Sequence, residues 1–119
     1  MGYQPTRNRV RNRPKTAQQD NIDKQILFLH QAMGEKLIAN HDYLTQVAET
    51  IQARYECGQM RQGAYLFWSS LLEYVEQPVL FMATLLEDSP QITQYRRQTP
   101  LVGILTEEER QKVLDQLTF

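Results

Sequence analysis

Four arginines near the start of this chain stand at every second residue, and a lysine follows them: Arg7, Arg9, Arg11, Arg13 and Lys15. In an extended chain this spacing places all four guanidinium groups on one side, at intervals of about 6.5 to 7 Å. Such a row could follow a phosphate backbone or lie in a narrow minor groove. It could equally contact an acidic protein surface, or remain a solvated tail. A helix would scatter the four groups around its circumference, and Pro14 disfavours one further.

The charge of the chain is segregated between this segment and the rest. Residues 1–19 hold five Lys/Arg and no Asp/Glu, whereas residues 20–119 hold eight Lys/Arg against fourteen Asp/Glu, so a net charge of −1 combines a basic arm with an acidic body. An acidic body would repel phosphates, and no exposed aromatics alternate with Lys/Arg as base-stacking surfaces require. A protein partner for the arm is therefore expected at least as strongly as a nucleic acid.

The residues that could act as ligands or nucleophiles are few and separated. His30 and His41 would stand about 16 Å apart along a continuous helix, and neither has a carboxylate or cysteine at ligand spacing, so both are predicted to lie on a polar face. Cys57 is the only cysteine, which excludes a disulfide within the chain and fits a reducing, cytoplasmic setting. Its position near a predicted helix end favours a structural role over a reactive thiol.

No arrangement of residues typical of a catalytic site is present in the sequence. The acidic pairs Glu73/Glu76 and Glu87/Asp88 are better explained as solvent-facing charges between apolar segments than as an acid and a base. The chain has no glycine-rich phosphate loop, no Gly-x-Ser-x-Gly turn and no Glu-x-x-His ligand pair. We therefore expect a protein that is not an enzyme and uses no cofactor or metal.

A second basic pair, Arg96-Arg97, precedes an unusually apolar segment, residues 101–105. These arginines could bind a carboxylate or phosphate on a partner, or they could be surface residues beside a connector that packs under the last helix. Gly103 indicates a positive φ or a close backbone approach within that connector.

The apolar spacing predicts an all-α fold, a small bundle of three to five helices in one domain, residues 19–119, behind a disordered basic arm, residues 1–18. Residues 20–57 form either one long helix or two helices that meet near Asn40, with Asp20 as the N-cap. Gly58 is suited to the left-handed position after the helix end.

Residues 61–86 are the most apolar part of the chain and are predicted to form the central helix. Pro78 should kink this helix or start a new one. Two neighbouring apolar stripes require cover on more than half of the circumference, either by the core or by a second chain. The candidate interface residues share one of these stripes and are Trp68, Leu72, Val75, Val79 and Met82.

Two capping signals predict the remaining helices. Ser89 before Pro90 is typical of a helix start, and that helix should end near Arg96-Arg97. Thr106 and Glu109 form a capping box for a last helix over residues 107–116, which should bury its apolar residues Val113, Leu114 and Leu117. No apolar run reaches the ~20 residues that span a bilayer, so no membrane association is expected.

These patterns together predict a cytoplasmic, non-enzymatic regulatory or adaptor protein that acts through protein–protein contacts and forms a homodimer. The alternative is a regulator that binds nucleic acid through the arginines of the arm.

Overall fold

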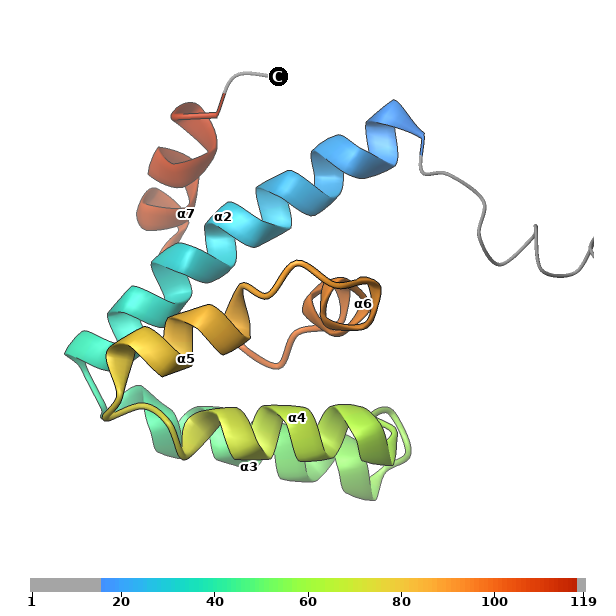
Figure 1. Ribbon diagram of the computed structural model, residues 1–119. Helices are drawn as coiled ribbons and strands as arrows, with labels where there is room; N and C mark the ends of the chain where they lie inside the picture. Colours follow the sequence, from blue (N-terminus) through green and yellow to red (C-terminus); the bar gives the residue numbers. More distant parts are fainter. Residues whose placement is uncertain (1–15, 118–119) are drawn as a thin grey trace, which may run out of the picture.

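The computed structural model describes residues 16–117, and these residues form six α-helices and no strand (Figure 1). The all-α class is confirmed. The number of helices exceeds the predicted three to five because two of the predicted helices are each divided in two. The helices are α2 (Ala17–Ala39), α3 (Tyr43–Glu56), α4 (Gln62–Leu72), α5 (Pro78–Leu85), α6 (Pro90–Arg97) and α7 (Glu107–Asp115).

The first predicted helix is divided at Asn40, which settles the alternative of one helix or two. Asn40 leaves the helical region with φ −142° and ψ 95°, and its side-chain oxygen accepts a hydrogen bond of 3.1 Å from the backbone N–H of Asp42. This local bond replaces the helical one, as asparagine side chains commonly do in turns. The start also differs, because Thr16 caps α2 through the N–H of Gln19, so residues 16–18 belong to the helical domain and Asp20 is not the cap.

The central apolar segment is broken rather than kinked. Pro78 is the first residue of α5, and Gln77 before it has φ −122° and ψ 79°, because a residue that precedes proline is kept out of the α region. Between the two helices the amides of Glu73, Tyr74 and Val75 bond to carbonyls only three residues back. These tight turns reverse the direction of the chain.

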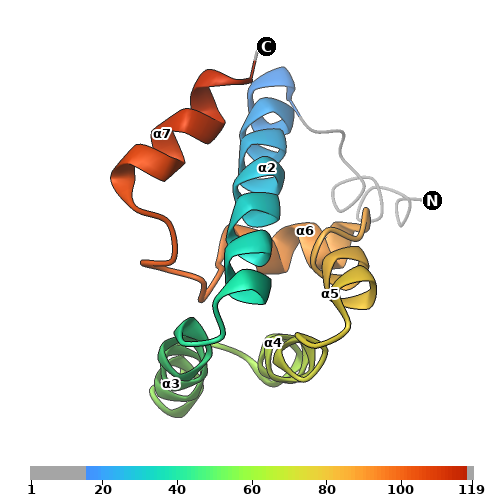
Figure 2. The ribbon, with the colours of Figure 1, turned by 90° about the vertical axis from the view of Figure 1, so that its left-hand side faces the viewer.

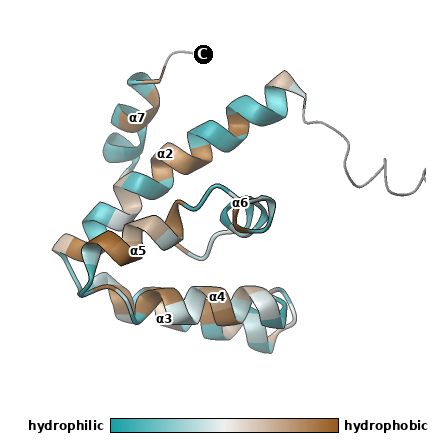
Figure 3. Cartoon of the chain, in the orientation of Figure 1, coloured by the Kyte–Doolittle hydropathy of each residue, from teal (hydrophilic) through white to brown (hydrophobic). Residues whose placement is uncertain are grey.

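Helix α2 is the element on which the other parts assemble. Helices α5, α6 and α7 each pack on α2, while α3 and α4 form an antiparallel hairpin below it (Figure 2). The fully buried side chains at the meeting point of these helices include Leu37, Trp68, Leu71, Phe81 and Leu85. In Figure 3, α5 is the most apolar helix, whereas α6 and α7 carry mostly polar residues.

The segment between α6 and α7 is the predicted apolar connector. Leu101 and Ile104 are buried, and Gly103 has a φ of 76°, which confirms its positive-φ position. The capping box of Thr106 and Glu109 is present. Helix α7 differs from expectation in its burial, because Val113, Leu114 and Leu117 are only half-buried.

An ion pair fastens α7 to α2. The Lys36 ammonium lies 2.6 Å from Oε1 of Glu109, which also accepts the backbone N–H of Thr106. The contact with Lys36, and after it the bond from Thr106, lowers the pKa of the Glu109 carboxyl. The Glu109 carboxylate therefore both caps the start of α7 and joins α7 to α2.

Gly34 allows the close approach of α2 and α5. A Cβ at this position would lie 2.7 Å from Sδ of Met82 and 2.8 Å from Cδ2 of Leu85, and Leu85 is fully buried with no room to move away. The glycine is therefore retained inside a helix despite its helix propensity, which is about 1 kcal/mol poorer than that of alanine.

We expect the substitution Gly34→Val to lower the free energy of unfolding by about 1–3 kcal/mol, because overpacking at this contact outweighs the gain in helix propensity. Chemical denaturation followed by circular dichroism measures the change. Glu35→Val, at the neighbouring exposed position, is the matched control and should change stability by no more than about 0.5 kcal/mol. A Gly34→Val protein as stable as the native chain would contradict the close contact.

Candidate protein-contact surfaces

The predicted basic contact residues are divided between two parts of the chain. Arg7, Arg9, Arg11, Arg13 and Lys15 lie outside the described residues. Arg96 and Arg97 lie at the end of α6, where both guanidinium groups already have partners within the chain.

Arg96 is a structural residue rather than a surface arginine. Its side chain is 5% exposed, and Nη1 donates to the carbonyls of Leu85 at 2.9 Å and Glu87 at 3.1 Å. Burial lowers the pKa of this guanidinium, while Asp23 and Asp88 act in the opposite direction. The group satisfies carbonyls at the end of α5 and so holds α5 against α6.

Arg97 binds a carboxylate, but the carboxylate belongs to this chain. Nε and Nη2 donate to the two oxygens of Asp23 at 2.9 and 2.8 Å, a bidentate pair that joins α6 to α2. The Asp23 side chain is 8% exposed, so the pair is mostly shielded from water. Both arginines therefore have partners within the fold, and their binding of an external carboxylate or phosphate stays a prediction.

The break at residues 73–77 divides the predicted interface stripe, whose role in binding stays a prediction. Trp68 and Val75 are buried within the chain, and Leu72 and Met82 are half-buried against the core. Only Val79 points outward, with 85% of its side chain exposed.

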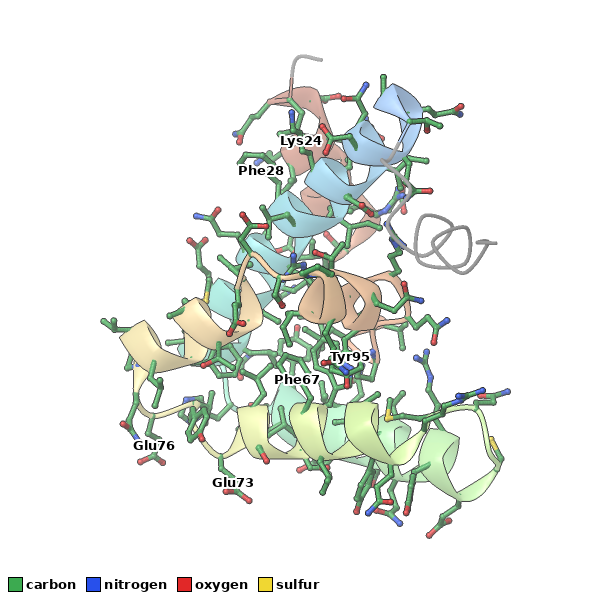
Figure 4. The ribbon with its side chains drawn as sticks, turned by 45° about the vertical axis from the view of Figure 1, so that its right-hand side comes forward. Lys24, Phe28, Phe67, Glu73, Glu76 and Tyr95 are labelled. Carbon is green, nitrogen blue, oxygen red and sulfur yellow. The ribbon has the colours of Figure 1, made fainter. Side chains whose placement is uncertain are left out.

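Val79 belongs to a larger surface, which we call the α5 patch: Glu73, Glu76, Pro78, Val79 and Leu80. Three consecutive apolar residues in the first turn of α5 are exposed, and Leu80 is 42% exposed. The two glutamates occupy the turn before α5 and project away from the helices (Figure 4). Apolar residues on a polar rim are typical of a contact site.

The charge around the α5 patch has a single sign. The 34 residues from Gln62 to Tyr95 contain no Lys, Arg or His and four acidic residues. Within residues 16–117, no cation lies at ion-pair distance from Glu73 or Glu76. The α5 patch therefore presents apolar side chains beside uncompensated negative charge.

A second surface, the arginine cleft, lies at the other end of α4. It is a pocket of about 850 Å³ between the turn that follows α3, the start of α4, and α6. The side chains that give it polar character are Arg54, Gln59, Arg61, Gln91, Gln94 and Gln98. Met60, Trp68 and Tyr95 add apolar surface, and no Asp or Glu lines the pocket.

The two arginines of the cleft differ in how they are held. Nη1 of Arg54 donates to the carbonyls of Gln98 at 3.2 Å and Thr99 at 2.9 Å, which fixes the guanidinium at the end of α6. No hydrogen bond or ion pair joins the Arg61 side chain to another described residue. The cleft therefore carries positive charge with no acid to balance it.

Helix α6 supplies one wall of this cleft through a single stripe. Gln91, Gln94, Tyr95 and Gln98 follow the i, i+3, i+4, i+7 spacing of one helical face. The Gln91 amide donates to the Tyr95 hydroxyl at 2.8 Å, which orders part of the wall. The stripe can be seen in the sequence, but the site was not predicted from it, because the other walls of the cleft come from residues distant in the chain.

His30 was predicted to lie on a polar face and is instead buried, with 1% exposure. Its ring stacks on Trp68 at 6.3 Å, Nδ1 donates to the Ile26 carbonyl at 2.7 Å, and Nε2 has no partner. Burial lowers the pKa of His30 from 6.5 to about 4. The ring is therefore a neutral core residue.

The remaining ligand candidates are dispersed. His41 and Cys57 are both exposed, so Cys57 lacks the buried position expected of a structural residue. Across residues 16–117, no three His, Cys, Asp or Glu side chains converge as metal ligands would. In the same range no helix has the length and apolar character needed to cross a membrane.

No family model, curated protein or solved structure matches this chain.

We expect the stability of the protein to fall between pH 6.5 and about 4 because of His30. In this range the unfolded chain binds a proton at His30, whereas the buried ring of the folded chain stays neutral. The contribution of His30 to the free energy of unfolding is therefore fully present above pH 6.5 and is lost as the pH falls toward 4. The loss amounts to about 3 kcal/mol. Denaturant unfolding at several pH values measures it.

His30→Phe is the comparison variant, since phenylalanine keeps the stacking on Trp68 and cannot titrate. The difference in unfolding free energy between the native chain and this variant should change by about 3 kcal/mol across the range, because carboxylates titrate equally in both. Two parallel stability curves would show that His30 does not titrate as described.

Proposed function

We propose that this chain is a non-enzymatic adaptor or regulatory protein that binds another protein through the α5 patch. The observation that carries the proposal is the exposure of Val79 and Leu80 beside Glu73 and Glu76, two carboxylates that form no ion pair within residues 16–117. Burying a valine side chain contributes about 1.5–3 kcal/mol, so a partner that covers Val79 would gain free energy of this order on binding.

The chemistry of the patch defines the partner. A complementary surface would place Lys or Arg opposite Glu73 and Glu76 and offer an apolar recess for Val79. Opposite charges steer the encounter and fix the register, while the apolar anchor supplies most of the affinity. The buried ionisable groups among the described residues support a non-enzymatic role. Asp23, His30 and Arg96 each take part in the packing between helices.

Site-specific photo-crosslinking in the native cell tests the proposal. A benzophenone side chain placed at Leu80 should give adducts with a different protein, and Glu73→Lys/Glu76→Lys in the same chain should reduce them at least tenfold. The matched control places the same probe at Glu108, an exposed residue of α7. Adducts at position 80 that are no more abundant than at position 108 would contradict the proposal.

The segregated charge favours a second function, nucleic-acid binding through the arm, because five cations of residues 1–19 face no acidic neighbour in sequence. Under this alternative, affinity for DNA or RNA would fall steeply with salt, and replacement of the four arginines by glutamine would abolish the affinity and its salt slope. Fluorescence anisotropy at several salt concentrations measures both. Affinity that persists in the variant, or no binding at low salt, would exclude this function.

A further inference from the structure

We infer that the α5 patch of one copy binds the arginine cleft of a second copy, so that the chain associates with itself head to tail. This inference rests on the proposed role of the α5 patch as a protein-contact surface and names the partner as this same protein.

The charges of the two surfaces are complementary. The α5 patch holds Glu73 and Glu76 with no cation between residues 62 and 95, and the arginine cleft holds Arg54 and Arg61 with no acid among its lining residues. Arg61 has no ion-pair partner within residues 16–117, and neither has Glu76. A net charge of −1 for the whole chain leaves almost no repulsion between copies.

The shapes and polarities of the two surfaces also correspond. The cleft, at about 850 Å³, has room for several side chains. Ala64 and Tyr95, which line the cleft and are half-buried, offer apolar surface to Val79, whose side chain is 85% exposed. The glutamine amides of the α6 wall can donate to carboxylates and to the unpaired backbone groups of a turn. An acidic turn with an apolar residue at its tip fits the volume, the apolar surface and the hydrogen-bond donors of the cleft.

One molecule cannot make this contact with itself. Arg61 and Glu73 flank the two ends of α4, and the eleven helical residues between them hold them about 18 Å apart. Figure 1 shows the turn into α5 at one end of α4 and α6 above the other end, and Figure 4 shows Glu73 and Glu76 far from Tyr95. The contact must therefore form between copies.

A contact between two different surfaces leaves one free patch and one free cleft on every pair. Such heterologous association continues to longer chains or closes into a ring, in contrast to a symmetric dimer. We therefore expect a weight-average mass that rises with concentration beyond twice the 14.0 kDa of one chain.

Two variants of the full chain test this geometry. The patch variant is Glu73→Lys/Glu76→Lys, and the cleft variant is Gln59→Ala/Arg61→Ala, which removes the charge of Arg61 without making the cleft complementary to the lysines of the patch variant. None of these four side chains takes part in an intramolecular hydrogen bond or ion pair within residues 16–117, so both variants should keep the native circular dichroism spectrum and melting temperature. Sedimentation velocity over a range of concentrations should show each variant alone as a monomer of 14.0 kDa.

The decisive sample is an equimolar mixture of the two variants. The patch variant retains an intact cleft and the cleft variant retains an intact patch, so the mixture should form a 1:1 dimer and nothing larger. The control Glu49→Lys/Glu108→Lys changes the net charge as the patch variant does, on exposed residues of α3 and α7, and should associate like the native chain.

The inference is overturned if the native chain stays monomeric at millimolar concentration, if either variant alone still associates, or if the mixture remains monomeric. Failure here together with adducts to another protein at position 80 would leave the adaptor proposal intact. Self-association without such adducts would retain this inference and remove the adaptor function.

Discussion

The interruption of the apolar segment before Pro78 is the constraint on which the rest of the structure depends. Proline has no amide to donate and forces Gln77 out of the α region, so α4 cannot continue into α5. The reversal of the chain packs Phe81 and Leu85 into the core, and Gly34 leaves space for Leu85 against α2. It also leaves Pro78, Val79 and Leu80 exposed to water. The same turn therefore completes the core and creates the α5 patch.

The two arginines that were predicted to bind a partner, Arg96 and Arg97, join helices in the structure, and so does Lys36. Arg96 holds the carbonyls at the end of α5, Arg97 clamps Asp23 of α2, and Lys36 attaches α7 through Glu109. Removing one partner of such a contact would leave the other without its hydrogen bonds, so these residues serve the packing between helices. Charged groups without an ion pair within residues 16–117 include Glu73 and Glu76 of the α5 patch and Arg61 of the arginine cleft, at opposite ends of α4.

Helix ends that depend on neighbouring residues could be predicted from the sequence. Contacts between residues far apart in the chain could not. Two helix caps depend on residues at most three positions apart, and the structure has both. They are Ser89 before Pro90 and the capping box of Thr106 and Glu109. His30 was misplaced because its residue type suggested a polar face, although its position between Ile26 and Met33 matches the buried stripe of α2. The pairing of Arg97 with Asp23 spans 74 residues, and the cleft gathers three separate segments, so spacing in sequence carries no signal for either.

The claim that the α5 patch is the contact surface of this protein is tested most directly by a crosslink between two differently marked copies. Cys57, the only native cysteine, is exposed beside the cleft residue Gly58, and Gln77→Cys in a Cys57→Ser chain marks the patch while it keeps Val79. A short bismaleimide should join the two kinds of copy in a mixture and give little product with either alone. Crosslinks that form equally between identical copies, or that fail in the mixture, would contradict the claim.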